Sequence, residues 1–295
     1  MLTKWTVSTS EAGNKLLPFL RRRLGSRWSA RKIKQGVDRN CCKVNGDVER
    51  FGSVVLREGD VIVFDEQELQ RLVMWDFVVE DKRILYEDQY FVVYNKSAGM
   101  ICDDPRVWQN LRERWFDACL VHRLDRETSG VWLIAKDGDC AKALEDLFRQ
   151  RRIEKEYLAI VDGVPRKRSG IVTNRLMKLD SGSGVVRWGQ APKKGQGVVA
   201  STSWFCEKSG NGVSLLRCQP HTGRTHQIRV HLSGLGLPIL GDYQYCRSFK
   251  SPYRPKRLLL HAYQIAFPHP MTKEAVIVKA PCPADFKQAL RKHRL

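Results

Sequence analysis

The chain has 295 residues, which is enough for two domains or for one large domain with an appendage. Apolar residues make up 42% of it, which favours a folded core over disorder, and no apolar run approaches the roughly 20 residues of a membrane-spanning helix. Lysines and arginines number 51 against 32 aspartates and glutamates, and the resulting net charge of +19 predicts a polyanionic partner such as nucleic acid.

The nine cysteines form no C-x-x-C pair, which argues against structural zinc, and their odd number is typical of reduced thiols in a cytosol. The opening segment, MLTKWTVSTSEAGNK, lacks the apolar core of a signal peptide and the arginine-rich character of a transit peptide. We therefore expect a cytoplasmic protein that has no part in a membrane.

Residues 14–66 are predicted to form a small domain. The segment NKLLPFLRRRL has its leucines on one face of a helix, with Pro18 in the first turn, where proline is tolerated. A second helix is expected over SARKIKQG, opened by Ser29 and ending near Gly36. An Asn-Gly pair at positions 45 and 46 predicts a hairpin, and LREGDVIVF adds a turn and a strand.

This predicted domain is strongly basic. Between Asn14 and Lys43 there are ten lysines or arginines and a single acid, Asp38. Most charged helix faces are merely solvated, but this concentration favours contacts to nucleic-acid phosphates. The predicted RNA-binding side chains are Arg21, Arg22, Arg23, Arg31, Lys32 and Lys34. The order helix, helix, strand, Asn-Gly turn and EGDVIVF resembles the S4-like RNA-binding domain, and that resemblance implies recognition of structured RNA.

Residues 67–82 have neither clean periodicity nor turn signals, and we expect them to connect the small domain to a large one over residues 83–295. There, strands follow one another directly in ILYEDQYFVVYNK, GVWLIAKD, KEYLAIVDG and GVVASTSWFCEKSGNGVSLLRCQP. CAKALEDLFRQ has the apolar spacing of one core-facing helix. This pattern predicts an α+β fold with a mostly antiparallel mixed sheet and not a doubly wound one.

The segment HRLDRETSG, residues 122–130, places a carboxylate between two arginines just before the apolar strand VWLIAK. A reactive group on a loop that a rigid strand fixes is a common active-site layout. Nearby cations lower the pKa of a carboxyl group, so Asp125 is expected to be ionised, as a nucleophile must be. Taken by itself, Asp125 could instead cap the amides of Thr128 or Ser129 in an ordered turn.

HRLDRETSG resembles the signature of the RluA family of pseudouridine synthases. The resemblance implies that Asp125 is the catalytic nucleophile and that Arg123 enters the RNA in place of the extruded base. Taking a base out of its stack costs a few kcal/mol, and a guanidinium plane can stack in the vacated space. His122 and Thr128, from the same string, are predicted to take part with Arg123 in base flipping and RNA binding.

Two further segments resemble motifs of the same family. EKEYLAIV resembles the second motif, which implies that Tyr157 lines the pocket against the uracil; on its own, Tyr157 could be a core aromatic residue of a strand. PHTGRTHQIRVHLSGLGLPILGD resembles the third motif, which makes Arg229 the basic partner of Asp125. Thr225 is predicted to cap the helix of this segment, and Arg224 before it is expected to bind phosphate.

RLLLHAYQIAFPHP resembles the last motif of the family, whose leucine closes the pocket. Leu260 is the best candidate and Leu258 the second, and an apolar residue there would exclude water from a glycosyl intermediate. One departure from the family is Ser97 in NKSAGM, where proline is common. His221, His226 and His231 recur at a spacing of five, which does not fit one helical face, so no metal site is predicted.

The resemblance implies the pseudouridine synthase fold and the isomerisation of uridine within RNA. The N1–C1′ bond breaks, the uracil turns in the pocket, and C5 is joined to C1′. No cofactor is expected, in agreement with the lack of a Gly-rich phosphate loop. Asp125 could attack C1′, attack C6 or assist elimination through a glycal. Family members with an S4-like front domain typically modify ribosomal RNA of the large subunit, which we expect here in preference to transfer RNA, and a monomer is the family default.

Two other functions remain as alternatives at the level of the sequence. A non-catalytic RNA-binding protein would keep the basic surfaces, but it would not need the full set of Asp125, Tyr157 and Arg229. A nucleosidase or glycosidase would need two cooperating carboxylates, and Glu127 is the sole near neighbour of Asp125.

Overall fold

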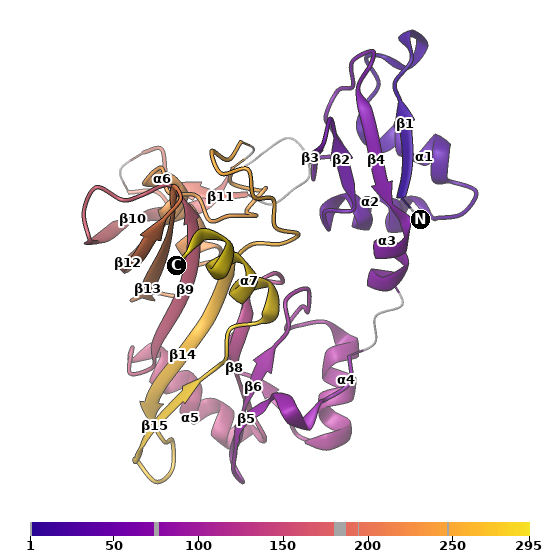
Figure 1. Cartoon of the computed structure of the whole chain (residues 1–295). Coiled ribbons are helices and arrows are strands. Elements are labelled where there is room, and N and C mark those ends of the chain that lie inside the picture. The colour runs from indigo at the N-terminus through magenta and orange to yellow at the C-terminus, as the bar shows by residue number, and fades with distance from the viewer. Residues whose placement is uncertain (1, 74–76, 180–186, 194, 247) are drawn as a thin grey trace. The chain divides into compact units, whose positions relative to one another are not determined.

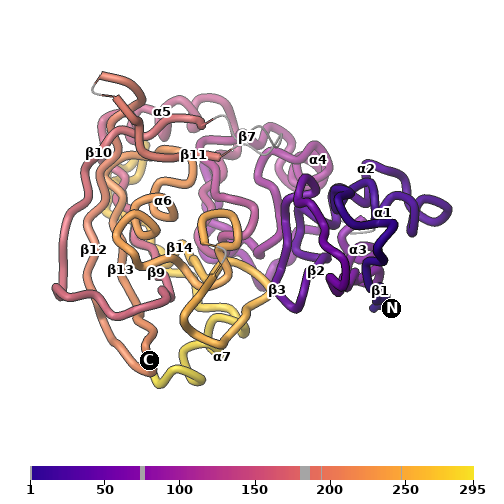
Figure 2. The backbone as a smooth tube through the Cα atoms, turned by 90° about the horizontal axis from the view of Figure 1, so that it is seen from above, coloured from indigo at the N-terminus to yellow at the C-terminus, as the bar shows by residue number. Residues whose placement is uncertain are grey.

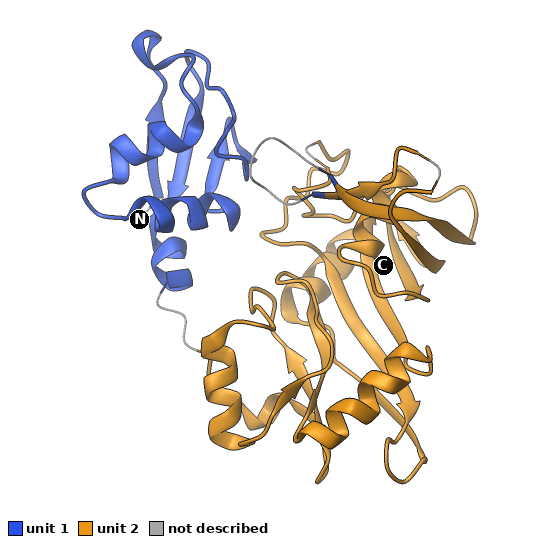
Figure 3. Cartoon of the chain, turned by 180° about the vertical axis from the view of Figure 1, so that it is seen from behind, with its two compact units in different colours: residues 1–76, 179–187 blue, residues 77–178, 188–295 orange. Residues whose placement is uncertain are grey.

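The computed structural model describes residues 2–73, 77–179, 187–193, 195–246 and 248–295. It divides into two compact units, which are coloured separately in Figure 3. The small unit comprises residues 1–76 and 179–187, and the large unit comprises residues 77–178 and 188–295. Every helix in the described ranges is too short or too polar to cross a bilayer.

The small unit has a four-stranded sheet in the order β1-β4-β2-β3. Its elements are β1 (Leu2–Thr6), η1 (Thr9–Glu11), α1 (Leu16–Leu24), α2 (Ala30–Asp38), β2 (Cys42–Val44), β3 (Asp47–Val48), β4 (Val61–Asp65) and α3 (Glu66–Val73). The two predicted helices and the hairpin are confirmed, and Asn45 and Gly46 both have the positive φ that a two-residue hairpin turn requires. Strand β1, which pairs with β4, was not predicted.

Two boundaries of the small unit differ from the predictions. Helix α2 continues through Gly36 to Asp38, because Gly36 is buried against the Phe64 ring, where a Cβ would come within 2.7 Å. The glycine therefore permits close packing and does not end the helix. The first half of the predicted connection, residues 67–82, lies in helix α3, which buries Leu69, while Glu66 accepts a hydrogen bond from Thr3.

The large unit is built on an 11-stranded sheet, which confirms the predicted α+β fold (Figures 1 and 2). The strands run in the order β11-β10-β12-β13-β9-β14-β8-β6-β5, with β15 on β14 and β7 on β8. They are β5 (Ile84–Glu87), β6 (Phe91–Lys96), β7 (Cys119–Leu120), β8 (Ser129–Ala135), β9 (Glu154–Asp162), β10 (Ser169–Leu179), β11 (Arg187–Gln190), β12 (Val198–Gly210), β13 (Val213–Pro220), β14 (Leu260–Pro268) and β15 (Ala275–Lys279). Among the pairings described, β8 and β14 are parallel and the others are antiparallel.

Helices cover this sheet and fix its strands. They are η2 (Asp81–Arg83), α4 (Pro105–Arg114), α5 (Gly138–Arg149), α6 (Gln227–Gly234) and α7 (Ala284–His293). Helix α5 packs on β7 and β8 through the apolar face that the sequence predicted, and it closes a core that also includes residues of β6, β14 and β15. All seven residues of β8 are buried. Helix α6 packs on β12 and β13. The strand after the HRLDRETSG segment is therefore one of the most firmly held parts of the unit.

The parallel contact between β8 and β14 is unusually close. Gly130 has a φ of 112°, and a Cβ at this position would lie 2.1 Å from the carbonyl oxygen of Ala262. Only glycine fits where two backbones approach in this way. Gly130 directly follows the loop that carries Asp125, and Ala262 lies two residues after Leu260, so the contact brings two predicted site segments together.

Candidate active site

A cleft of about 1200 Å³ opens in the large unit, between the loop at residues 121–128, the beginning of β9, the loop at residues 219–226, helix α6 and the first residue of β14. Its lining includes every site residue that the sequence predicted in this unit: His122, Arg123, Asp125, Thr128, Tyr157, Arg224, Arg229 and Leu260. Segments that are more than 100 residues apart in the chain thus meet at one cavity.

The loop at residues 121–128 begins where the chain leaves the sheet at His122. Strand β7 pairs with β8 as far as Leu120 and Ile134. Beyond that pair, the backbone amide of Leu133 donates to Nε2 of His122 at 2.9 Å, and the Trp132 indole donates to the His122 carbonyl oxygen at 3.3 Å. The His122 side chain thus accepts the amide hydrogen bond that a strand carbonyl would otherwise accept. The residues after His122 therefore leave the sheet and line the cleft.

Buried groups hold the far side of the same loop. The Lys96 ammonium, which is completely buried, donates to the carbonyl oxygens of Ser97, Met100 and Arg126 at 2.9–3.2 Å. The amide of Leu124 donates to Sγ of Cys102 at 3.4 Å. Burial lowers the pKa of Lys96 to about 8. Three carbonyl acceptors on two segments leave the loop little freedom.

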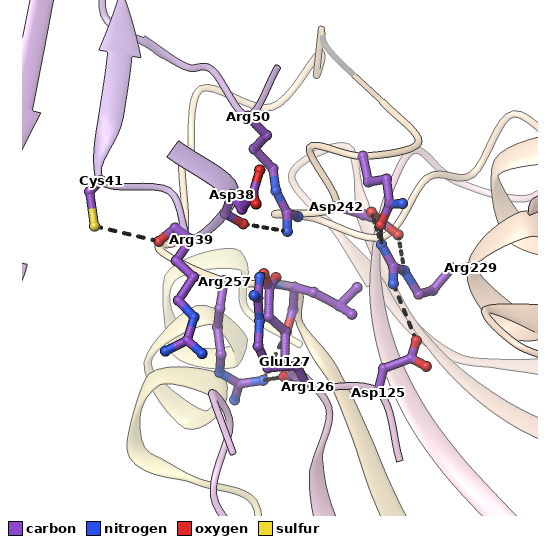
Figure 4. Close-up of polar contacts among 12 residues, drawn as sticks. Asp38, Arg39, Cys41, Arg50, Asp125, Arg126, Glu127, Arg229, Asp242 and Arg257 are labelled. Atoms are coloured by element: carbon purple, nitrogen blue, oxygen red, sulfur yellow. Dashed lines mark hydrogen bonds and ion pairs between the residues drawn. The ribbon is translucent and has the colours of Figure 1, made fainter. Parts of the chain in front are cut away.

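Asp125 lies at the centre of this loop and points away from its own backbone. Its carbonyl oxygen, not its side chain, accepts the hydrogen bond from the Thr128 amide that closes the turn. The carboxylate instead accepts from Nη1 of Arg229 at 3.2 Å (Figure 4), and about a quarter of the side chain is exposed in the cleft. The turn-capping alternative left open by the sequence is therefore not what the structure shows.

Arg229 is buried in helix α6 and held on every side. Its Nε and Nη2 donate to the two carboxylate oxygens of Asp242, each at 2.8 Å, and Nη2 also donates to Oε1 of Gln244 at 2.8 Å (Figure 4). The guanidinium carbon lies 4.9 Å from the centre of the Tyr245 ring. A bidentate ion pair and a stacked aromatic ring fix the plane of the guanidinium, so that Nη1 is aimed at Asp125.

The charges around Arg229 keep it protonated. Burial alone would lower its pKa, but Asp242 first, and then Asp125 and Glu127, raise the pKa of Arg229 above its usual range. The arrangement therefore presents a carboxylate in an open cleft, with one of its oxygens bound to a permanent cation. It can direct an oxygen nucleophile or stabilise charge at a bound sugar.

Tyr157 and Leu260 belong to the apolar part of the cleft lining. Tyr157 lies on β9 opposite Cys218 of β13, and Leu260 begins β14 and is only 3% exposed. Burial raises the pKa of the Tyr157 phenol, and the charge of Asp125 adds to this effect, so the ring stays uncharged. A flat aromatic ring and a leucine at such a site can hold a planar base.

The two predicted RNA-binding arginines of the cleft lie at its exposed rim. Arg123 is 62% exposed and pairs with Asp103 at 3.1 Å. Arg224 is exposed, and its Nε donates to the carbonyl oxygen of Val199 at 3.2 Å. Exposed pairs of this kind cost little to break, so both guanidinium groups can turn toward a phosphate.

Two of the predicted RNA-binding residues, Thr128 and His122, also have structural roles, and the predicted cap by Thr225 is wrong. Thr128 is 2% exposed, and its amide closes the turn of the Asp125 loop. His122 is tied to β8, as described above. Thr225 does not cap α6, because the helix begins at Gln227 and its N-cap is His226 with a φ of 56°. Oε1 of Gln227 instead accepts hydrogen bonds from Thr222 and from the amide of Arg224.

The predicted RNA-binding residues of the small unit all lie on the surface of α1 and α2. Arg21, Arg22, Arg23, Arg31, Lys32 and Lys34 are each exposed. Arg23 pairs with Glu11 at 2.7 Å and Lys34 with Asp38 at 2.8 Å, while Ile33 and Val37 of α2 face the core. The basic side chains of both helices thus lie outside the core.

Sequence reasoning missed several residues that the site depends on. Asp242 ends the PILGD segment, and the only signal was an acid directly after Gly241. Lys96 follows the apolar run FVVYN, and a lysine at the end of a buried strand could have been noticed. Tyr245 and Gln244 carried no signal, because their roles depend on a helix that precedes them by more than ten residues.

Comparisons with known proteins agree with this geometry. Residues 90–234 match the family model described as RNA pseudouridylate synthase, and this range contains Asp125, Tyr157 and Arg229. The chain is 32% identical over 309 residues to ribosomal large subunit pseudouridine synthase C of Haemophilus ducreyi, covering 98% of this chain and 95% of that protein. It is 37% identical over 227 residues to the Escherichia coli K12 protein of the same name, covering 72% and 70%.

The fold is similar to that of two solved human proteins. RNA pseudouridylate synthase domain containing 4 has a TM-score of 0.62 at 29% identity, covering 72% of this chain and 93% of that chain. RNA pseudouridylate synthase domain containing 1 has a TM-score of 0.60 at 27% identity, covering 72% of this chain and 94% of that chain.

The first prediction concerns the buried ion pair behind the site. Asp242→Asn removes the charge that compensates a guanidinium which is 6% exposed, and we expect the free energy of unfolding to fall by about 3 kcal/mol, as for other broken buried pairs. Urea denaturation measures this change. Asp146→Asn, at an exposed pair with Arg149, is the control and should cost less than about 1 kcal/mol. If both variants lost the same free energy of unfolding, the buried ion pair between Asp242 and Arg229 would not have the stabilising role assigned to it.

The second prediction concerns acid. Burial, with a smaller effect of Lys155, lowers the pKa of His122 to about 3 from an unfolded value of 6.5. Between these two pH values, His122 is protonated in the unfolded chain but neutral in the folded chain. The contribution of His122 to the free energy of unfolding is therefore complete above pH 6.5 and is lost as the pH falls toward 3. In His122→Gln, an amide oxygen can replace Nε2, and the free energy of unfolding should fall less steeply over this window.

His221→Gln serves as its control, because that imidazole is exposed and does not hold the loop at residues 121–128. If His122→Gln and the wild type lost stability in parallel on acidification, His122 would not be the neutral anchor of the loop.

Proposed function

The chain belongs to the RNA pseudouridylate synthase family, as the resemblance to RluA enzymes predicted, and we propose that it isomerises uridines in the ribosomal RNA of the large subunit. The enzyme class follows from the family. The substrate rests on the relatives named above, whose names specify the ribosomal large subunit. The observation that carries the mechanism is the contact between Asp125 and Arg229 inside a cleft that Tyr157 and Leu260 also line.

In this mechanism Asp125 is the nucleophile or the base that assists departure of the uracil. Arg229 fixes one carboxylate oxygen, so the other is directed into the cleft, where C1′ of a flipped nucleotide can approach. An oriented reactant needs less reorganisation to reach the transition state. The N1–C1′ bond then breaks, the uracil turns, and C5 is joined to C1′.

Tyr157 and Leu260 hold the detached uracil while it turns. At that point the uracil is no longer bonded to the sugar. The cleft must therefore keep the uracil near the sugar and keep water away from C1′. An uncharged phenol ring and a buried leucine present apolar surfaces that allow rotation without a fixed hydrogen bond. Leu258, the second candidate for this role, is not among the residues that line the cleft.

Arg123 and Arg224 receive the RNA strand at the rim. Arg123 is the residue that stacks in the space left by the flipped base, for which its exposed guanidinium and weak pairing with Asp103 are suited. Arg224 binds a phosphate beside the opening. His122 and Thr128 line the cleft and also support this region by holding the loop at residues 121–128.

The small unit is an S4-like RNA-binding domain that includes α3, and residues 83–295 belong to the catalytic domain. The exposed basic face of α1 and α2 supports this assignment. All nine cysteines are free thiols, which supports action in a reducing cytoplasm. We also propose that the protein acts as a monomer, which is the default of the family, and that the chemistry requires no cofactor.

The catalytic assignment predicts a selective loss in Asp125→Asn. The amide keeps the shape of the side chain but is a poor nucleophile and base, so pseudouridine formation should fall by at least about 10³-fold. Tritium release from RNA labelled at C5 measures this, and filter binding should show nearly unchanged RNA affinity. Asp139→Asn on the surface of α5 is the control and should retain wild-type activity.

Assaying unmodified large-subunit ribosomal RNA and transfer RNA side by side tests the substrate. Product in transfer RNA alone would reject the ribosomal assignment, and a fully active Asp125→Asn variant would reject the role of the carboxylate.

The assignment of the small unit predicts a change in salt dependence. Replacing Arg21, Arg22 and Arg31 by glutamine should weaken RNA binding and flatten the plot of log affinity against log salt concentration by roughly 0.7–0.9 per lost phosphate contact. The rate at saturating RNA should be retained, because the cleft is unaltered. Lys142→Gln on α5 is the control of equal charge change per site. An unchanged salt slope would exclude these helices from the RNA interface.

A further inference from the structure

The isomerisation leaves one proton without an assigned acceptor. Once C5 has been joined to C1′, C5 still carries its hydrogen, and the aromatic uracil returns only when that proton leaves. This question rests on the proposed mechanism. Proton transfer of this kind is faster when a positioned side chain takes the proton, by about 10²- to 10⁴-fold. The acceptor must lie close to Asp125, because C5 is now bonded to the carbon that Asp125 faces.

Most titratable side chains around the described cleft are unsuited to this task. Lys96 is a buried ammonium bound to three carbonyl oxygens. Nε2 of His122 already accepts from the Leu133 amide. The pKa of Tyr157 is raised, which makes its phenolate harder to form. His231, on α6 itself, is buried between Thr202 and Asn174 and is not among the residues that line the cleft.

His226 lines the cleft and faces Asp125. Its Nε2 lies 4.0 Å from Oδ2 of Asp125, the same oxygen that Arg229 binds. Nδ1 is 2.8 Å from the hydroxyl of Tyr245, and the two rings meet edge to face with centroids 5.6 Å apart. The imidazole is thus oriented by a hydrogen bond at one nitrogen while the other is directed toward the reacting carboxylate, which is the usual arrangement of a histidine base.

The backbone at His226 is built for this placement. The residue has a φ of 56°, in the left-handed region that few side chains adopt, and as the N-cap of α6 it makes no capping hydrogen bond with its side chain. Gln227, next in the chain, is anchored to Ser201 and Thr202 of β12. A strained residue beside an anchored one directs the imidazole into the cleft, and strain of this kind is found where function requires it.

To act as a base through Nε2, His226 must carry its hydrogen on Nδ1, and the hydrogen bond between Nδ1 and the Tyr245 hydroxyl is compatible with this tautomer. The Tyr245 hydroxyl already accepts from the amide of Trp188 at 3.1 Å and can also accept from Nδ1–H of His226. Burial raises the pKa of Tyr245 to about 12, so the phenol remains intact as this partner.

We propose that His226 is a catalytic residue that accepts the C5 proton in the last step of the reaction. The C5–H electron pair becomes the second bond of C5=C6, the C6=N1 double bond becomes single, and N1 takes up a proton. Nε2 of His226 receives the proton from C5 and returns it to solvent or to N1, so no net proton is consumed. The carboxylate of Asp125 has been regenerated by then and is ready for the next turnover.

The test is an isotope effect at C5. RNA is isolated from cells that lack the protein and that were grown with uracil carrying deuterium or hydrogen at C5, so that ribosomal and transfer RNA are both present. His226→Asn is the variant of choice, because asparagine tolerates a positive φ but cannot act as a base. We expect the rate to fall by about 10²-fold or more, with a severalfold slower reaction of the deuterated RNA.

Arg229→Lys is the matched comparison, because it slows the reaction through Asp125 and not through the C5 proton. Its deuterium effect should stay at the wild-type value. In His226→Gly the space of the ring is left open, and added imidazole should restore the rate in proportion to its concentration. RNA affinity should be nearly unchanged in both His226 variants.

Three outcomes would overturn the proposal: a slow His226→Asn variant without an increased isotope effect, no rescue of His226→Gly by imidazole, or a loss confined to RNA affinity. Modification of transfer RNA alone would reject the ribosomal substrate while leaving the isotope test of His226 valid.

Discussion

The site depends on one ion pair, between Asp125 on a loop and Arg229 on a helix, whose charged atoms lie 3.2 Å apart although 104 residues separate them in the chain. Neither partner is held by this contact alone. Asp242 and Tyr245 fix the guanidinium, and Lys96 and His122 fix the loop on its two sides. Each partner of the ion pair is therefore held in place independently of the other. Such rigid support gives a catalytic carboxylate a defined direction.

The sequence predicted the parts of the site whose signal is local. Asp125, Tyr157 and Arg229 stand in short strings, and the structure brings them to one cleft. The α+β class was predictable because alternation and turn residues are also local. Asp242 and Lys96 could not be assigned, because a buried charge acquires its role from a partner that only the fold supplies. Gly36 and Thr225 were misread for the same reason, since packing against Phe64 and the hydrogen bonds of Gln227 decide those helix ends.

The basic surplus of the chain is divided between two tasks. On α1 and α2 it is exposed and suited to phosphates of any sequence, whereas inside the cleft Arg229 is buried and bound to Asp242. Exposed basic side chains provide affinity for RNA, whereas a guanidinium held in an ion pair provides a fixed position in the site. A protein that must first find a large RNA and then act on a single atom needs both kinds.

The close approach at Gly130 has a consequence for how the enzyme tolerates change. A methyl group at this position would collide with Ala262 and force β8 and β14 apart. The loop that carries Asp125 would then move away from Leu260. Such a variant would keep every reactive group and every basic side chain. However, Asp125 and Leu260 would be too far apart to contact the same nucleotide. The width of the reaction chamber is thus set by the missing side chain of one residue that takes no part in the chemistry.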